Sequence, residues 1–503
     1  MYKNKGLEVL RLGIDSHQER IVYLNADCHV VQSEGFTSHS RVCVDTGIES
    51  IIASVNITHN GLVTSDQAAF SEAAWRALGL KGGERVMIKH AKPVNSMSHV
   101  RSKLYGGKLD YPACLEIVSD IQSGQYSDIQ LSSFVSACTA DRLSNEETLA
   151  LTRSMIDVGE RISWDQPLVM DKHCVGGLPG NRTTPIVVAI VAACGLIMPK
   201  TSSRAITSPA GTADTMEVLT NVELTQEKMQ QVVAQEGACL AWGGSVSLSP
   251  ADDIIIRIER ALNLDSEGQL VASVLSKKVA AGSTHVLIDI PVGPTAKVRS
   301  FEQARKLEDK LVKTGKALGL EVLVHRSDGS QPVGRGIGPA LEARDILSVL
   351  KNHSSAPVDL RDRAVYLAGL MLEMAGVVDS GAGVLKAQEV LDSGEAYQKF
   401  IAICETQGGL KEIPKSSHQV DHLASCSGIV THFNNRCLAQ LARLAGAPNS
   451  KVAGVELLVR LGDRVEKGQP LFRIHANAKG EMEYALDFLA QHSDCCQVSG
   501  ETV

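Results

Sequence analysis

The 503-residue chain has neither an apolar run long enough to cross a bilayer nor an excess of positive charge. Its longest apolar run, residues 186–198, has 13 residues, whereas a membrane-spanning helix needs about 20. The formal net charge is −7. Because nucleic acids and anionic membranes attract basic surfaces, we expect neither as a partner. Single basic loops can still bind small anions.

Cysteine patterns for zinc sites and disulfide frameworks are also missing. The chain has 12 cysteines but no Cys-x-x-Cys pair, and its only close couple is Cys495–Cys496. The N-terminus carries charges but lacks the apolar core of a signal peptide. We therefore expect reduced thiols, a cytoplasmic protein and no metal site.

The apolar pattern predicts a multidomain α/β protein, and the length is typical of about three or four domains. Short β-branched runs predict a β-rich N-terminal module, and Ser144 with Glu147 forms a capping box typical of a helix start. Alternating strand and helix signals after residue 166 predict a mostly parallel sheet. The expected parts are a β-rich module (1–88), a helical domain (89–165, completed by 250–282), a phosphate-binding α/β domain (166–430, interrupted by 250–282) and a small α+β domain (431–503).

Residues 170–185 (MDKHCVGGLPGNRTTP) have the composition of a phosphate-binding loop. We expect a strand that ends at Met170 and an apolar helix with Thr184 at the N-cap and Pro185 at its first position. Glycines let backbone N–H groups approach an anion, and the helix dipole and Lys172 add positive charge. The alternative is a tight strand-to-helix turn without a ligand.

Residues 200–214 (KTSSRAITSPAGTAD) form a second loop rich in hydroxyls, on the other side of the same helix. One fold can therefore bring both loops to one cleft. Two other phosphate-binding motifs do not match. Gly180 is followed by Asn181 rather than by the Lys of a Walker loop, and the dinucleotide-binding pattern GxGxxG is absent. Cys174 is more typical of a packing residue than of a nucleophile.

These motifs resemble the thymidine phosphorylase family, which carries related KHSTGG and SGRGLGHTGGT loops. The resemblance is to the branch that contains the AMP phosphorylases and bacterial proteins named as thymidine phosphorylases. It extends to residues 327–345 and to GDRVEKGQPL in the tail, so it spans nearly the whole chain. Members of the family cleave the base–sugar bond of a nucleoside or nucleotide with inorganic phosphate, without a metal or other cofactor.

The resemblance also implies roles for individual residues. The attacking phosphate or the anionic end of the substrate would contact Lys172, Gly177, Thr183 and Thr212, and His173 would lie near the sugar and base. The substrate would be held by the second loop, residues Ser203, Arg204, Ala205, Ile206, Thr207 and Ser208.

The insertion at 250–282 would complete the site. The resemblance makes Asp265 the proton donor to the leaving base, places Ser273 and Lys277 on the base, and brings Lys297 to the substrate. Ser273 and Lys277 are four residues apart and share one helix face. Without the resemblance, an N-cap for Asp265 and a solvated face for the pair are the simpler interpretations.

One departure bears on the substrate. Pyrimidine-specific relatives carry an Arg about four helical turns before the Ser, and here that position falls on Ile258 or Glu259. We therefore expect a nucleoside 5′-monophosphate such as AMP, which would give free base and ribose 1,5-bisphosphate. The alternative substrate is thymidine, which would give thymine and 2-deoxyribose 1-phosphate. Sugar, base and assembly stay open, although a homodimer or larger homo-oligomer is expected, with the N-terminal module as its assembly element.

Two competing interpretations are weaker. An anthranilate-type phosphoribosyltransferase would need magnesium and a GTGGD-like loop, and CVGGLPGN lacks the acidic residue. The tail also resembles turns of biotinyl and lipoyl carrier domains. Its nearest candidate for a modified lysine, Lys479, has the wrong neighbours.

Overall fold

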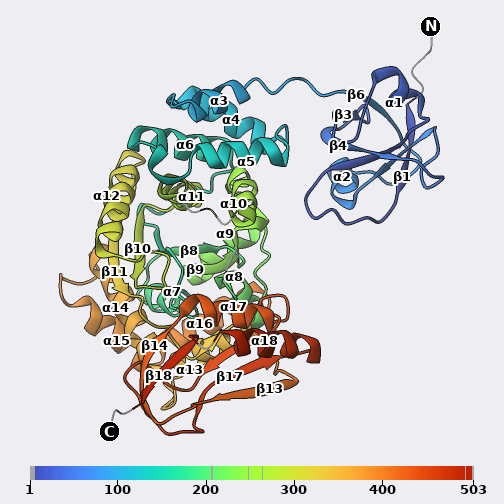
Figure 1. The fold of residues 1–503 in the computed structure, drawn as a ribbon. Helices are drawn as coiled ribbons and strands as arrows, with labels where there is room; N and C mark the ends of the chain where they lie inside the picture. The colour runs from blue at the N-terminus through green and yellow to red at the C-terminus, as the bar shows by residue number, and fades with distance from the viewer. Residues whose placement is uncertain are drawn as a thin grey trace. The chain divides into compact units, whose positions relative to one another are not determined.

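The computed structural model describes residues 6–500 except 206, 207, 247, 263, 265 and 493. The chain divides into two compact units, Met1–Ala137 and Cys138–Val503. The first unit contains a strand-rich part followed by a helical part (Figure 1). Its elements are β1 (Leu7–Arg11), β2 (Ile21–Asn25), α1 (His29–Glu34), β3 (Arg41–Asp45), β4 (Ser50–Thr58), β5 (Gln67–Phe70), α2 (Glu72–Ala77), β6 (Arg85–His90), α3 (Met97–Leu104), α4 (Tyr111–Gln122) and α5 (Asp128–Ala137).

The N-terminal strands close into a barrel with the order β1-β5-β2-β4-β3-β6 (Figure 1). Alternate residues of β2 and β3 are fully buried, including Val22, Leu24, Val42 and Val44. This alternation is the period of two expected for strands with one face in a core. The predicted β-rich module is therefore a closed barrel, which leaves no strand edge unpaired.

The second unit begins with an α/β region. Its elements are η1 (Ala140–Arg142), α6 (Asn145–Asp157), β7 (Met170–Cys174), α7 (Thr184–Ala193), β8 (Met198–Ser202), α8 (Thr212–Leu219), α9 (Gln226–Glu236), β9 (Ala238–Trp242), η2 (Gly243–Val246), α10 (Pro250–Leu262), α11 (Glu267–Ala280), β10 (His285–Val292), α12 (Phe301–Ala317), β11 (Glu321–Asp328), β12 (Gly336–Ile337), α13 (Pro339–Leu350), α14 (Val358–Met374), α15 (Gly383–Asp392) and α16 (Glu395–Gln407).

The strands of this region run parallel, in the orders β11-β10-β7 and β8-β9. A bridge between Val169 and Ile197 joins the two groups just before β7 and β8. Helix α7 is buried along its length and packs against α14 and α16. The predicted capping box of α6 is confirmed, since Ser144 and Glu147 bond each other's backbone N–H. The carboxyl ends of parallel strands are where such sheets bind ligands.

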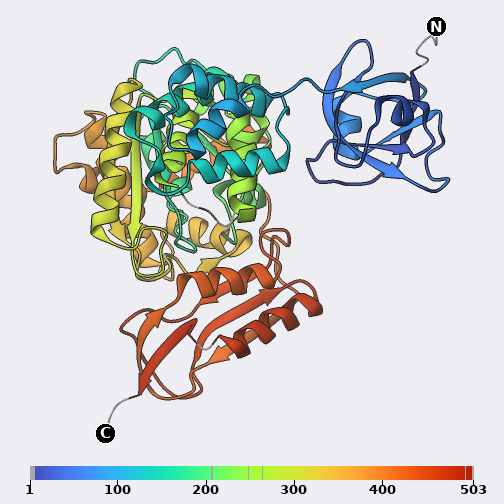
Figure 2. The same ribbon diagram turned by 45° about the horizontal axis from the view of Figure 1, so that its top comes forward.

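The C-terminal region has β13 (His418–Leu423), β14 (Gly428–Phe433), α17 (Asn435–Leu444), β15 (Gly454–Leu457), β16 (Arg464–Val465), β17 (Pro470–Ala476), α18 (Lys479–Gln491) and β18 (Cys496–Gly500). Its two sheets have the orders β12-β15-β17-β13 and β16-β14-β18. Helices α17 and α18 pack on each other and on β15 and β17, respectively (Figure 2).

Strand β12 comes from the α/β region, so this region contributes a strand to a C-terminal sheet. Arg460 strengthens the connection by donating to the carbonyl oxygens of Pro332 and Gly334, each at 2.8 Å. Val333 in turn pairs with Gly180 and accepts a hydrogen bond from the N–H of Asn181 at 2.8 Å. The C-terminal region is thus connected to the first glycine-rich loop through residues 332–337.

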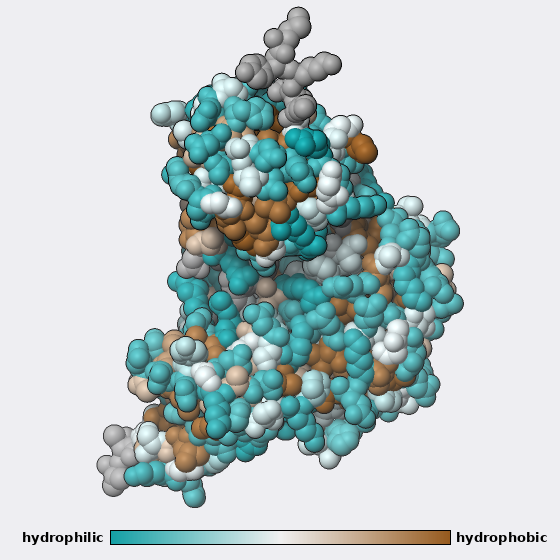
Figure 3. Space-filling model, turned by 90° about the vertical axis from the view of Figure 1, so that its right-hand side faces the viewer, coloured by the Kyte–Doolittle hydropathy of each residue, from teal (hydrophilic) through white to brown (hydrophobic). Residues whose placement is uncertain are grey.

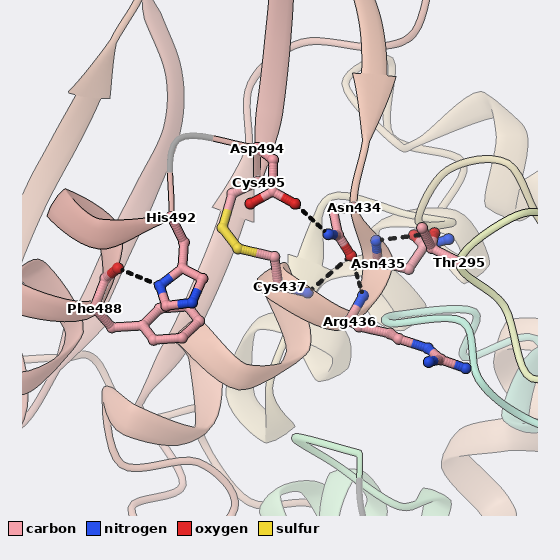
Figure 4. The surroundings of a disulfide bond; sticks show 9 residues. All are labelled: Thr295, Asn434, Asn435, Arg436, Cys437, Phe488, His492, Asp494 and Cys495. Atoms are coloured by element: carbon pink, nitrogen blue, oxygen red, sulfur yellow. Dashed lines mark hydrogen bonds between the residues drawn. A yellow bond between two sulfur atoms is a disulfide. The ribbon is translucent and has the colours of Figure 1, made fainter.

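The expectation that all cysteines are reduced thiols is wrong. Cys437 in α17 and Cys495 before β18 form a disulfide (Figure 4). The spacing of 58 residues gives no local signal, and the fold alone brings the two sulfurs together. Asn434 lies beside the disulfide, where it caps α17 and donates to Asp494 at 2.6 Å (Figure 4).

No helix within the described residues is long and apolar enough to cross a membrane. One face of the molecule is covered mainly by hydrophilic side chains with smaller hydrophobic areas between them (Figure 3).

Candidate active site

Lys172 and His173 lie within strand β7 rather than in the loop after it, so the predicted strand end at Met170 is wrong. The strand continues to Cys174 because it pairs in parallel with residues 285–289 of β10. The side chain of Lys172 is fully buried, and its Nζ donates to Thr183 Oγ1 at 2.8 Å and to Thr184 Oγ1 at 3.4 Å. Burial lowers the pKa of Lys172.

The N-cap of helix α7 is Thr183, so the prediction of Thr184 is wrong by one residue. Thr183 makes no side-chain capping bond, because its hydroxyl oxygen instead accepts from Lys172. Pro185 still lies in the first turn, where its missing N–H is harmless.

Gly177 allows the backbone of Lys297 to lie close to the first loop. Its φ of +80° is in the left-handed region, and a Cβ added there would lie 2.3 Å from the backbone nitrogen of Lys297. Only a glycine allows this approach. Gly176 has a similar φ of +91° but no atom near the corresponding Cβ position.

These two glycines give a matched test of the close approach. We expect Gly177→Ala to lower the free energy of unfolding by about 1–3 kcal/mol more than Gly176→Ala, because both add left-handed strain and only the first adds a clash. Chemical denaturation of both variants measures the difference. Equal losses would show that Lys297 moves away freely.

Arg182 joins the first loop to the second. Its Nε donates to Glu342 Oε2 at 2.7 Å, its Nη1 to Thr212 Oγ1 at 3.0 Å and its Nη2 to the carbonyl oxygen of Ala210 at 2.8 Å. Glu342 is buried and also accepts from the hydroxyl of Thr215 at 2.7 Å. Burial raises the pKa of Glu342, and the charge of Arg182 opposes that shift.

The second loop is held by acidic residues. Asp214 accepts the N–H groups of Ala205 and Gly211 at 2.6 and 2.9 Å. Arg204 forms a paired contact with Glu217 at 2.8 and 2.7 Å and lies 4.8 Å from the ring of Trp242. Hydrogen bonding to Glu217 raises the pKa of Arg204. Arg204 therefore serves as an anchor of the loop in this structure.

The other predicted residues of this loop have separate positions. Ser203 is exposed, and its carbonyl oxygen accepts from the backbone N–H of Ala213. Ser208 is exposed and donates to the carbonyl oxygen of Ala210 at 3.0 Å. Ile206 and Thr207 lie outside the described residues.

Ser202, which sequence reasoning missed, ends strand β8. Its Oγ is buried without a hydrogen-bond partner within the described part of the chain. A buried hydroxyl without a partner at the carboxyl end of a parallel strand is suited to a ligand. The position of Ser202 in the hydroxyl-rich sequence TSSR (201–204) was the available sequence signal for a role in the site.

A charged cluster that sequence reasoning also missed lies beside His173. Asp171 is fully buried between Lys200 Nζ at 3.0 Å and Lys278 Nζ at 2.8 Å. Burial raises the pKa of Asp171, but the two lysines outweigh it and hold the pKa below its usual value. Burial lowers the pKa of Lys278 despite Asp171.

The environment of His173 favours its neutral form. Burial lowers its pKa well below the usual value, and the charges of Lys278, Lys200, Lys172 and Lys277 lower it further. A neutral imidazole can donate one hydrogen bond and accept another without adding charge. The positive charges around the imidazole favour an anion nearby.

The predicted pairing of Ser273 and Lys277 on one helix face is confirmed. Both lie on α11 and contact Asp252 of α10, at 2.9 and 2.5 Å. Asp252 is buried and both partners are half-buried, so a solvated face is the wrong interpretation. Burial lowers the pKa of Lys277, but Asp252 and Asp253 outweigh it and raise the value.

The remaining residues of the insertion are placed only in part. Of the two candidates for the position of the arginine in pyrimidine-specific relatives, Ile258 is buried in α10 and Glu259 follows it on the same helix. Asp265 lies outside the described residues. No cluster of His, Cys, Asp and Glu fit for a metal ion occurs among the residues that are described.

Sequence models of three domain families match the chain. They are described as the glycosyl transferase family helical bundle domain (residues 98–159), the glycosyl transferase family a/b domain (166–397) and the pyrimidine nucleoside phosphorylase C-terminal domain (429–494).

Among curated relatives, "Putative thymidine phosphorylase" of Hahella chejuensis is 59% identical over 98% of both chains. "Putative thymidine phosphorylase 2" of Acidovorax sp. is 56% identical over 98% of this chain and 96% of its own. A solved structure of anthranilate phosphoribosyltransferase from Thermus thermophilus superposes with a TM-score of 0.51 at 20% identity, covering 61% of this chain and 98% of that one. At this identity the superposition shows a shared fold alone.

Proposed function

Because this chain belongs to the thymidine/AMP phosphorylase family and is a nucleoside phosphorylase of the glycosyltransferase type, we propose that its nucleophile is inorganic phosphate bound beside Lys172. The phosphate would attack the anomeric carbon of a pentose and release the free base.

The buried charge of Lys172 is the observation that carries this proposal. Among the described residues, the partners of its Nζ are hydroxyls, and no carboxylate lies within 4.0 Å. A buried ammonium without a counter-ion is unfavourable, so the site is suited to an anion. Both Lys172 and Thr183 are fully buried, so an anion reaches them only after the neighbouring loops move apart.

The hydroxyl of Thr183 is oriented for a phosphate oxygen. An ammonium group can only donate, so Thr183 Oγ1 accepts from Lys172 and keeps its own hydrogen for a further acceptor. The N-terminus of α7 adds backbone N–H groups and a partial positive charge. The first loop thus supplies several donors to one anion.

The chemistry of bond cleavage fits the other residues. Loss of the base builds positive charge on the sugar and negative charge on the base. The phosphate dianion stabilises the first, and Ser273 and Lys277 are proposed to bind the base. Asp265 is proposed to donate the proton to the leaving base, as the family resemblance implies. Neutral His173 would bind the sugar or base without opposing the charge on the sugar.

For the substrate we propose a nucleoside 5′-monophosphate such as AMP, which would give ribose 1,5-bisphosphate. Ser203 and Ser208 supply two exposed hydroxyls in the loop assigned to the anionic end of the substrate, and Arg204 anchors that loop through Glu217. Neither Ile258 nor Glu259 supplies a positive charge for a pyrimidine oxygen.

Thymidine is the second candidate, favoured by the names of the relatives that are 53–59% identical to this chain. Initial rates with AMP, CMP, thymidine and uridine at saturating orthophosphate separate the two candidates. We expect kcat/KM for AMP to exceed that for thymidine by at least about 10-fold, since a bound 5′-phosphate adds charge-assisted hydrogen bonds. Faster turnover of thymidine would reverse the assignment. Absence of phosphate-dependent base release from every substrate would overturn the function itself.

A further inference from the structure

The side chain of Arg182 connects the two loops that line the proposed phosphate site. It starts in the first loop, next to Thr183, and two of its nitrogens donate to Thr212 and Ala210 at the end of the second loop. Its Nε donates to Glu342 of α13. All three nitrogens are therefore used within the protein, and the planar guanidinium holds its acceptors in fixed directions.

The acceptor that anchors Arg182 is itself firmly held. Glu342 is buried, and it accepts from the hydroxyl of Thr215 and from the backbone N–H of Gly338. Thr215 and Thr212 both belong to α8, one turn apart. Glu342 and Arg182 together therefore attach the first turn of α8 to the first loop.

The contact with Arg182 also sets the direction of the Thr212 hydroxyl. A guanidinium can only donate, so Thr212 Oγ1 is the acceptor in this bond and retains its own hydrogen for another acceptor. Lys172 has the same relation to Thr183. Two hydroxyls, one on each loop, are thus oriented as donors by buried or half-buried cations.

We propose that Arg182 is a positioning residue that fixes the spacing of the two loops and presents the Thr212 hydroxyl as a donor to the attacking phosphate. This inference rests on the proposed function and assigns Arg182 no contact with substrate. Its loss weakens binding of phosphate more than binding of the nucleoside or nucleotide.

The test compares two variants, one that keeps the carboxylate of Glu342 and one that replaces it. Arg182→Lys keeps a cation beside Glu342, but one ammonium cannot reach the three acceptors with guanidinium geometry. Arg182→Gln combined with Glu342→Gln removes both charges, so the variant can fold without a buried unpaired carboxylate. Arg361→Gln with Asp392→Asn is the matched control, because it removes another ion pair, of 2.6 Å, between α14 and the end of α15.

Equilibrium dialysis with radiolabelled orthophosphate and steady-state kinetics measure the effect. We expect the Kd and KM for orthophosphate to rise at least 10-fold in both Arg182 variants, with the KM for the nucleoside or nucleotide within threefold of wild type. The control stays within twofold in every constant. Thermal melts confirm folding.

The results that would overturn the inference differ from those that would overturn the proposed function. A folded Arg182 variant that binds orthophosphate within twofold of wild type overturns the inference, as does an equal rise in both KM values. If the wild-type protein itself neither binds orthophosphate nor releases base, the proposed function is wrong and the inference falls with it.

Discussion

Replacing Lys172 with Met is expected to lower kcat/KM for orthophosphate by about 10²–10³-fold, or ~3–4 kcal/mol of transition-state stabilisation. Methionine has a similar length but neither charge nor donors. The variant loses the ammonium that faces the phosphate and the bond that orients the Thr183 hydroxyl. Initial rates at varied orthophosphate and saturating nucleoside or nucleotide measure the change.

Folding is not the expected cause of this loss. Lys172 is buried among hydroxyls, so its replacement removes a charge that burial disfavours. The melting temperature should be equal to or above that of wild type. Lys386→Met on α15 is the matched control, because this lysine pairs with Glu389 on the protein surface. Activity within 10-fold of wild type in a folded Lys172→Met protein would contradict the assignment.

Removal of Asp171 is expected to be the most destabilising single change in the site. Asp171→Ala leaves the ammonium groups of Lys200 and Lys278 buried without their shared carboxylate. Breaking a buried ion pair from one side costs about 3–5 kcal/mol. We expect the melting temperature to fall by about 10 °C and base release to fall with it.

A triple variant separates charge from packing. Asp171→Asn with Lys200→Met and Lys278→Met has no buried charge at this position and should recover at least half of the lost stability. The pKa of Asp171 lies below its usual value in the folded protein. The ionised carboxylate therefore stabilises the fold above about pH 4, and this stabilisation is lost as the pH falls through the lowered pKa. The difference in melting temperature between wild type and Asp171→Ala should therefore narrow in acid. If the melting temperatures of wild type and Asp171→Ala differ by less than about 2 °C at neutral pH, the two lysines rearrange when the carboxylate is removed.

The sequence was most informative where one side-chain pattern determines one local geometry. The capping box at Ser144, the parallel strands after residue 166 and the shared face of Ser273 and Lys277 follow from periodicity and hydrogen-bonding capacity. The multidomain α/β class follows in the same way from the alternation of elements.

The errors occurred where a partner distant in sequence decides the outcome. Strand β7 extends through Lys172 because β10 pairs with it, and Thr183 forgoes its capping bond because Lys172 uses the hydroxyl. The Cys437–Cys495 disulfide likewise depends on the folded C-terminal region. The roles of Asp171 and Arg182 were also hidden, because their partners lie 29 to 160 residues away.

Because strand β12 of the α/β region pairs with β15 of the C-terminal region, the enzyme cannot be shortened freely at its C-terminus. A fragment that stops before residue 418 would keep every lysine and threonine of the candidate active site. In that fragment, however, β12 would have no neighbouring strand, and the carbonyl groups of Pro332 and Gly334 would lose Arg460. The same segment pairs with Gly180 through Val333. The C-terminal region therefore acts as a brace for the glycine-rich loop, and a minimal catalytic unit has to include it.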